Sequence, residues 1–221
     1  MSRHASLVLF DLDGTLIDSA PDLAAAANAM RDERGLPPLP LADLRPWVGS
    51  GARGMLGAAL GVTPDDADFI ALRDEFLDRY SVASLVHTAL FASVAPVLDR
   101  LDALGLRWGI VTNKAARFTL PIVEGLGLAQ RAAAMVCGDT TPHSKPHPAP
   151  LFEAARRVGV VPRHCVYLGD DQRDIVAGRA AGMAVLAAGW GYLGHGEPIE
   201  AWGADDVLAA PSGLLKWLEL A

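Results

Sequence analysis

The apolar positions of the chain form two repeating patterns, short continuous runs and runs with helical spacing. Continuous apolar runs of four or five residues predict strands that are buried on both faces. Helical spacing lies between these runs, so most predicted strands are followed by a helix that covers the sheet. The predicted strands are residues 7–10, 108–112, 134–137, 165–168 and 184–188, and the predicted helices are residues 94–104, 118–125, 151–158, 175–182 and 212–220. This alternation predicts an α/β fold with a doubly wound parallel sheet.

A different pattern fills residues 19–84, where no strand is predicted. The segment SAPD at residues 19–22 is typical of a helix start, with a capping serine followed by proline and aspartate in the first turn. The predicted helices of this segment are residues 23–34, 41–47, 52–60 and 65–84. We therefore expect a helical domain at residues 18–87, inserted into a core domain made of residues 1–17 and 88–221.

Two carboxylates follow the first predicted strand directly. Asp11 and Asp13 come immediately after the apolar run that ends at Phe10. Burying an ionised carboxylate is costly unless it is paired with a cation or binds a metal. Gly14 lets the chain turn after the strand, so that both acids can point into one pocket. The end of this strand therefore predicts a cation nearby.

Polar residues also follow the other predicted strands. Thr112 and Asn113 follow the second strand, Lys145 lies in the loop after the third, and Asp170 and Asp171 follow the fourth. Because ligands of parallel sheets bind beyond the carboxyl ends of the strands, we expect these side chains to converge on one edge. Oxygen-rich sites of this kind suit Mg²⁺. The sequence therefore predicts that Mg²⁺ and the lysine neutralise the acids.

Four stretches resemble, in order, the signatures of the haloacid dehalogenase superfamily. They are DLDGTLIDS at residues 11–19, VTNK at 111–114, SKP at 144–146 and GDDQRD at 169–174. The match spans nearly the whole chain, and the helical insert between the first two signatures resembles the cap of the phosphoglycolate phosphatase-like group. The resemblance implies a Rossmann-like core and a Mg²⁺-dependent phosphatase. Such an enzyme would hydrolyse a small phosphate ester through an aspartyl-phosphate intermediate.

The resemblance also implies the roles of individual residues. Asp11 would be the nucleophile that attacks phosphorus. Asp13 would protonate the leaving alcohol and later activate water. Lys145 would stabilise both the nucleophile and the transferred group by its charge, while Thr112 and the backbone amide of Asn113 would bind the phosphoryl oxygens.

The metal ligands follow from the same resemblance. The carboxylates of Asp11 and Asp170 and the backbone carbonyl of Asp13 would bind Mg²⁺. Asp174 would lie behind these ligands and orient a water molecule or the catalytic lysine. Asp171 is an alternative to Asp174 in this place, and the sequence leaves the two open.

A glycine-rich segment lies within the predicted helical domain. Residues 49–54 (GSGARG) match the pattern G-x-G-x-x-G, but they do not follow the first strand of a β-α-β unit, so dinucleotide binding is not predicted. A turn that opens a helix fits better. Arg53 would then be placed to meet a substrate anion when the cap closes, or would be an ordinary surface arginine.

The substrate and the reaction class have several alternatives. Residues 29–38 and 111–117 also resemble the N-acetylmuramic acid 6-phosphate phosphatases. A sugar phosphomutase of the same superfamily would use the same nucleophile and return the phosphate to a sugar. A non-catalytic regulatory protein with a phosphate-accepting aspartate is the alternative from another class, although the long insert and Asp13 speak against it.

The composition of the chain limits its possible binding partners and its cellular location. The formal net charge of −7 argues against nucleic-acid and anionic-membrane partners, because such binders concentrate positive charge on one face. No apolar run is long enough to span a membrane or to form a signal peptide. Cys137 and Cys165 form no cluster and predict small core residues rather than a disulfide. We expect a cytoplasmic protein, and the sequence leaves its oligomeric state open.

Overall fold

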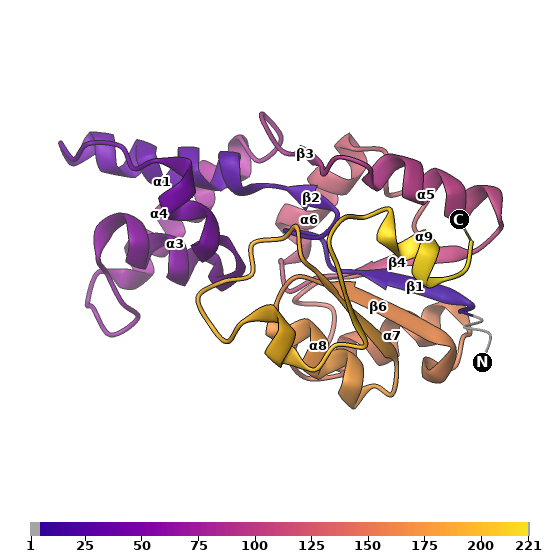
Figure 1. Cartoon of the computed structure of the whole chain (residues 1–221). Coiled ribbons are helices and arrows are strands. Elements are labelled where there is room, and N and C mark those ends of the chain that lie inside the picture. The colour runs from indigo at the N-terminus through magenta and orange to yellow at the C-terminus, as the bar shows by residue number, and fades with distance from the viewer. Residues whose placement is uncertain (1–4, 221) are drawn as a thin grey trace.

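The computed structural model describes residues 5–220. Its main sheet has six strands in the order β5-β4-β1-β6-β7-β8 (Figure 1), and every neighbouring pair is parallel. Strand β1 (Leu7–Phe10) lies between β4 (Arg107–Val111) and β6 (Cys165–Gly169). This order places the carboxyl ends of the three strands next to one another, and the sheet confirms the predicted α/β fold class.

Both faces of the sheet are covered by helices, as the continuous apolar strands predict. Val8 and Phe10 pack in the same core cluster as residues of α5, α6 and α9, whereas Leu7 and Leu9 pack with residues of α7 and α8. Successive side chains of a strand point to opposite faces, so every residue of β1 is buried. The other strands and the helices of this part are β5 (Ala134–Val136), β7 (Ala184–Ala188), β8 (Asp206–Leu208), α5 (Val94–Ala103), α6 (Ala116–Gly125), α7 (Ala149–Val158), α8 (Gln172–Ala180) and α9 (Gly213–Trp217).

A helical unit lies beside the carboxyl edge of the sheet (Figure 1). Its helices are α1 (Ala20–Glu33), α2 (Leu41–Leu44), α3 (Gly51–Leu60) and α4 (Phe69–Val82), with a 3₁₀ helix at Arg45–Ser50. Helix α4 is shorter than the predicted 65–84, since residues 64–68 form turns before it. Helices α1, α3 and α4 contact one another and bury Met30, Met55 and Phe76 completely.

The two connections between the helical unit and the core run side by side. Strand β2 (Ile17–Asp18) pairs antiparallel with β3 (Ala89–Leu90), a ribbon that the sequence pattern does not predict. The buried carboxylate of Asp22 accepts hydrogen bonds from the backbone N–H groups of Val86, His87 and Thr88 at 2.9–3.1 Å. Asp22 therefore fixes the returning connection to the start of α1.

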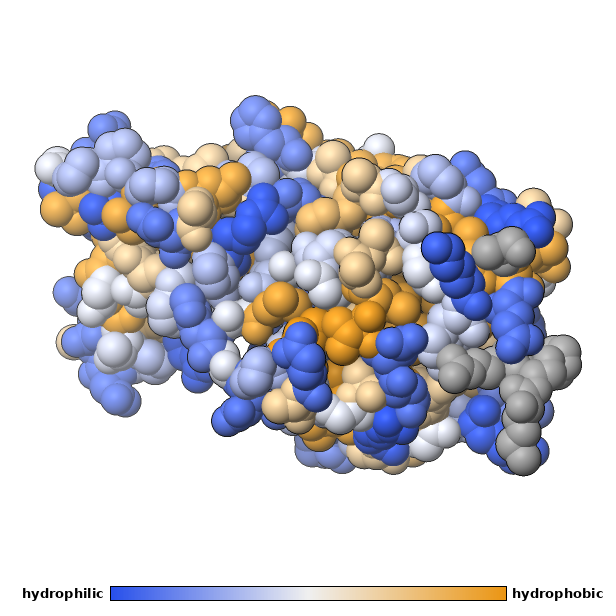
Figure 2. All heavy atoms as spheres, viewed as in Figure 1, coloured by the Kyte–Doolittle hydropathy of each residue, from blue (hydrophilic) through white to orange (hydrophobic). Residues whose placement is uncertain are grey.

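The outer surface is mixed in character. In the view of Figure 2, hydrophilic residues lie over both the helical unit and the core, and apolar atoms gather near the middle of the core. Among the described residues, none of the helices combines the length and the apolar character needed to cross a membrane.

Candidate active site

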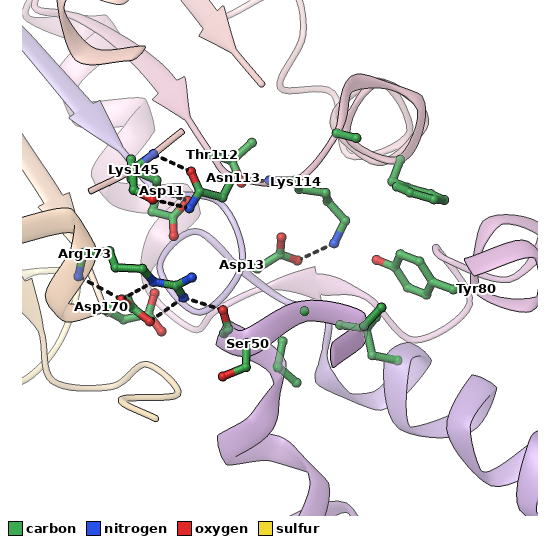
Figure 3. A pocket seen from close by; sticks show the side chains of 18 of the residues that line it. Asp11, Asp13, Ser50, Tyr80, Thr112, Asn113, Lys114, Lys145, Asp170 and Arg173 are labelled. Carbon is green, nitrogen blue, oxygen red and sulfur yellow. Dashed lines mark hydrogen bonds and ion pairs between the residues drawn. The ribbon is translucent and has the colours of Figure 1, made fainter. Parts of the chain in front are cut away.

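A cavity of about 400 Å³ lies between the carboxyl edge of the sheet and the helical unit. Figure 3 shows that charged side chains gather on its core side. The residues that line the core side are Asp11, Asp13, Thr112, Asn113, Lys114, Lys145, Asp170, Asp171, Arg173 and Asp174. The helical unit supplies a mainly apolar wall with Leu23, Val48, Phe76, Leu77 and Tyr80. The three residues expected to be catalytic therefore lie at one cavity.

The turn after β1 carries the first two acids. The N–H group of Asp11 donates to the carbonyl of Leu168 in the neighbouring strand at 2.9 Å, and its carboxylate accepts from the N–H group of Leu12 at 2.7 Å. Gly14 has a φ angle of 85°. A Cβ atom at this position would lie only 2.0 Å from Oδ2 of Asp170. Glycine is required here by both the left-handed backbone and the close approach.

Lys145 is the cation that pairs with Asp11, whereas Asp13 pairs with Lys114. The Nζ atom of Lys145 lies 2.9 Å from Oδ1 of Asp11 and 2.7 Å from Oδ1 of Asp174, and its side chain is only 3% exposed. The ammonium also donates to the carbonyl of Val111 at 3.0 Å and to the hydroxyl of Tyr167 at 2.8 Å. Burial lowers the pKa of this ammonium, but the two carboxylates outweigh burial and raise it. Lys145 is therefore held in its charged form.

Negative charge remains in excess around this lysine. Asp170 is buried and accepts hydrogen bonds from the Thr15 hydroxyl at 2.9 Å and the Tyr192 N–H group at 2.8 Å. Burial, followed by the charges of Asp11 and Asp174, raises the pKa of Asp170 well above its usual range. Burial also raises the pKa of Asp11 to about 7, against the opposing charge of the nearby lysine and with the added effect of Asp174. One ammonium does not neutralise three carboxylates.

The three acids fit a divalent cation. Asp11, Asp170 and Asp174 each offer a carboxylate oxygen, and these oxygens all lie within 4.8 Å of one another. Hard oxygen ligands at a buried, negatively charged place are the donor set that Mg²⁺ prefers. The side chain of Asp13 does not belong to this cluster. The residues present therefore fit the expected ion.

Asp13 lies on the other side of the cavity and has its own partners. Its Oδ1 atom accepts a short hydrogen bond from the Ser19 hydroxyl and lies 2.8 Å from Nζ of Lys114. The side chain of Asp13 is 17% exposed. Figure 3 shows Asp13 between the acidic cluster and the helical unit.

Thr112 and Asn113 follow β4, and their side chains organise the neighbouring loops. Asn113 accepts from the N–H group of Lys145 at 2.9 Å and donates to the carbonyl of the same residue at 3.0 Å. This pair of hydrogen bonds holds the lysine loop against the end of β4. The buried Thr112 hydroxyl accepts from the N–H group of Lys114 at 3.1 Å. Both residues line the cavity.

The start of α8 separates the roles of Asp171 and Asp174. Asp171 caps the helix by accepting from the N–H group of Arg173 at 2.8 Å, and it forms an ion pair with the Arg173 side chain at 2.7 Å. Asp174 accepts from the N–H group of Asp171 at 3.1 Å and also contacts the Lys145 ammonium. Arg173 in addition donates a short hydrogen bond to the carbonyl of Gly49 in the helical unit. Of the two alternatives, Asp174 therefore lies in the acidic cluster.

The structure does not bring Arg53 into the cavity. Its side chain is exposed on α3, and the neighbouring residues Ser50, Gly51 and Ala52 line the cavity instead. Because Met55 and Ala59 direct the buried face of the helix into the helical unit, Arg53 points to solvent in this arrangement.

Two cavity residues were not assigned a role by the sequence analysis. Lys114 directly follows the Thr112–Asn113 pair. The chain has only three lysines, so a lysine next to predicted site residues was a signal that it belongs to the site. Tyr80 belongs to the apolar face of a predicted helix, and nothing in that pattern indicates that its hydroxyl faces a cavity.

Comparisons with known proteins agree with this arrangement. A family model described as haloacid dehalogenase-like hydrolase matches residues 8–188. A phosphoglycolate phosphatase of Xanthomonas campestris pv. campestris is 50% identical over 213 residues, which cover 96% of each chain. An N-acetylmuramic acid 6-phosphate phosphatase of Pseudomonas aeruginosa is 42% identical over 214 residues, which cover 97% of this chain and 95% of the relative.

Solved structures give the same result. The crystal structure of a predicted phosphoglycolate phosphatase from Haemophilus somnus 129PT matches with a TM-score of 0.85 and 29% identity, covering 97% of this chain and 98% of that chain. The chain belongs to the haloacid dehalogenase-like hydrolase family. It is an enzyme of that family, and its similarity to named phosphatases confirms the prediction of a phosphatase.

Proposed function

We propose that this protein is a Mg²⁺-dependent phosphomonoester hydrolase that uses Asp11 as its nucleophile and 2-phosphoglycolate as its substrate. The observation that carries the mechanism is the position of Asp11, which directly follows β1, belongs to the acidic cluster and contacts the buried Lys145 ammonium. The relative that is 50% identical and named phosphoglycolate phosphatase supports the choice of substrate.

The residues of the chain account for both halves of the reaction. A carboxylate oxygen of Asp11 forms a bond to phosphorus while the bond from phosphorus to the ester oxygen breaks. Asp13 gives its proton to the departing alcohol. It then takes a proton from the water that attacks phosphorus, which releases inorganic phosphate and restores Asp11. Lys145 and the Thr112 hydroxyl would stabilise the phosphoryl oxygens during both transfers.

Mg²⁺ would be held by Asp11, Asp170 and the backbone carbonyl of Asp13, with Asp174 behind them. When bound, the ion supplies positive charge that screens the repulsion between the phosphate and the nucleophile. The three carboxylates provide oxygen ligands of the required kind in a buried place.

The helical unit would act as a cap over this site. We assign residues 18–87 to the cap and residues 1–17 and 88–221 to the core, of which residues 1–4 and 221 lie outside the described part of the chain. The cavity walls come from both parts, so closure would exclude water from the first transfer. Two buried cysteines without a disulfide support a cytoplasmic location.

N-acetylmuramic acid 6-phosphate is a second candidate substrate, favoured by the relative that is 42% identical and named for it. The two candidates differ greatly in size. The names of both relatives disfavour a phosphomutase and a non-catalytic phosphate acceptor, because both proteins are phosphatases.

Purified protein is expected to release phosphate from 2-phosphoglycolate with the highest kcat/KM in a panel of phosphorylated metabolites that includes N-acetylmuramic acid 6-phosphate. Removal of Mg²⁺ with a chelator should abolish the release, and added Mg²⁺ should restore it. Phosphate release is measured with and without the metal. A higher kcat/KM for the amino-sugar phosphate would replace the proposed substrate, and activity that survives chelation would remove the metal from the mechanism.

The metal-free protein is expected to become less stable as the pH rises from about 4 to 7. Burial raises the pKa of Asp11 to about 7, whereas an aspartate in an unfolded chain titrates near 3.9. Between these values the folded protein holds a proton that the unfolded chain has released, so raising the pH lowers the free energy of unfolding. Mg²⁺ should reverse this loss above pH 7. Melting temperatures measured at several pH values, with and without Mg²⁺, check both statements.

The variant Asp170→Asn tests whether the excess of buried carboxylates around Lys145 destabilises the metal-free protein. The amide of the variant can still accept from the Tyr192 N–H group, and the variant lacks an acid whose ionisation burial opposes. We expect a melting temperature a few degrees higher without metal, where about 1 kcal/mol corresponds to about 2–4 °C for a chain of this size, and no further rise with Mg²⁺. Asp65→Asn, which removes an exposed carboxylate of the helical unit, is the matched control. A variant that is still stabilised by Mg²⁺ as strongly as the wild type would contradict the assignment of Asp170.

A further inference from the structure

One ammonium group faces the leaving-group side of the cavity. The walls that the helical unit supplies there are mainly apolar, with Leu23, Val48 and Phe76 among them. Lys114 enters this region from the end of β4, and its side chain is only 10% exposed. Among the described residues that line the cavity, Lys114 is therefore the cation on the side of Asp13, whereas Lys145 lies on the side of the nucleophile (Figure 3).

The ammonium of Lys114 has N–H donors that are available to a ligand. An ammonium carries three N–H donors, and the one hydrogen bond of standard geometry found for it within residues 5–220 goes to Asp13, at 2.8 Å. Burial lowers the pKa of this lysine, but Asp13 and then Tyr80 outweigh burial and raise it above its usual range. The group is therefore charged at neutral pH, with positive charge available to a ligand.

Tyr80 provides a second polar atom at the same place. The side chain is 1% exposed, and its hydroxyl oxygen has no hydrogen-bond partner of standard geometry in the described part of the chain. The Lys114 Nζ atom lies 4.9 Å from the centre of the Tyr80 ring. Figure 3 shows the hydroxyl turned toward Lys114 and Asp13. The Tyr80 hydroxyl interacts with the Lys114 ammonium closely enough to raise the pKa of the lysine, so the two groups form one polar position in an otherwise apolar wall.

We propose that Lys114 and Tyr80 form a binding site for a carboxylate on the leaving group, and that this site makes the enzyme specific for phosphate esters of short hydroxy acids. The proposal rests on the proposed function, because it needs the ester oxygen to lie next to Asp13. A carboxylate is planar and accepts several hydrogen bonds, so one group can accept from both the ammonium and the phenol.

The position of Asp13 limits how far the carboxylate is from the ester oxygen. A general acid lies about 2.6–3.2 Å from the oxygen that it protonates, and the Lys114 ammonium lies 2.8 Å from the same carboxylate. A carboxylate bonded to the ester carbon itself, as in 2-phosphoglycolate, is short enough to reach this ammonium while the ester oxygen contacts Asp13. In N-acetylmuramic acid 6-phosphate the lactyl carboxylate lies across the sugar ring from the phosphate, so the same two residues do not suit it as well.

The test compares two substrates that differ only in this group. In ethyl phosphate, a methyl group stands where 2-phosphoglycolate has its carboxylate. For each enzyme, kcat/KM is measured with both esters in saturating Mg²⁺, and the ratio of the two values is taken. The ratio cancels any loss that comes from disturbing Asp13, because that loss affects both esters.

In Lys114→Met we expect the ratio to fall by about 10- to 100-fold, as for the loss of a hydrogen bond to a charged group. In Tyr80→Phe, which removes a single hydroxyl, we expect a fall of about 2- to 10-fold. Lys216→Met removes an exposed lysine far along the chain and is the matched control, whose ratio should equal that of the wild type. Melting temperatures establish that each variant is folded, and Tyr80→Phe carries the test if the lysine variant does not fold.

Equal losses for both esters, with an unchanged ratio, would show that Lys114 only orients Asp13 and would overturn the proposal. A wild-type enzyme that does not distinguish the two esters would overturn it as well. Absence of Mg²⁺-dependent turnover in the wild type is a separate result, because it would remove the proposed function itself.

Discussion

Replacing Asp11 with asparagine is expected to lower kcat by about 10⁴- to 10⁶-fold, the range seen when a catalytic nucleophile is removed. The amide is a poor nucleophile, and no other carboxylate occupies its place at the end of β1. The side chain of the variant can still accept the hydrogen bond from the N–H group of Leu12, so the turn should keep its shape. Steady-state kinetics and the melting temperature, measured on the same preparation, separate lost chemistry from lost folding.

Asp65→Asn again serves as the control, because it makes the same chemical change at an exposed place. The control should keep the wild-type kcat. If Asp11→Asn retained even one hundredth of the activity while folded, the attack on phosphorus would have to come from another group, such as water.

Replacing Lys145 with methionine is expected to have the second largest effect, a decrease in kcat of about 10²- to 10³-fold. Methionine keeps much of the length of the side chain but leaves Asp11 and Asp174, which lie 2.9 and 2.7 Å from the ammonium, without their positive partner. The phosphoryl group then meets uncompensated negative charge. The expected loss is smaller than for Asp11 because the nucleophile itself remains.

Lys216→Met controls for the loss of a lysine elsewhere in the chain and should leave kcat unchanged. Lys145→Met is measured in saturating Mg²⁺, which should limit any loss of stability from the two unpaired acids. A folded variant with wild-type kcat would rule out the assigned role of this ammonium.

The fold and the acidic edge of the sheet could be predicted from the sequence because both depend on local signals. Strand β1 is a continuous apolar run, and the predicted ends of β4 and β6 lie within one residue of the observed ends. Parallel strands bring their carboxyl ends to one edge, so the residues after each strand could be expected to meet there. Strands β2 and β3 escaped prediction because two residues carry no recognisable period, and β8 escaped because it begins with Asp206 and so offers only two apolar residues.

The contacts that depend on distant segments could not be predicted in the same way. Lys114 and Asp13 form an ion pair although they are 101 residues apart, and no local pattern encodes their distance. Tyr80 lies in the helix predicted at residues 65–84, and helical spacing does not indicate which groups its hydroxyl will face. Asp171 and Asp174 were equivalent in the sequence, and only the capping of α8 distinguishes them. Arg53 was left open between a substrate contact on cap closure and an ordinary surface arginine, and in this arrangement it is exposed on α3.

The most direct test of the account is to trap a covalent intermediate on Asp11. Wild-type enzyme is mixed with Mg²⁺ and a phosphate ester, quenched within milliseconds and reduced with borohydride, which converts an aspartyl phosphate to homoserine. Mass spectrometry of the peptides then locates the change. The account predicts homoserine at residue 11, and only in samples that received substrate. Rapid turnover with an unmodified residue 11, or with the modification at another aspartate, would contradict it.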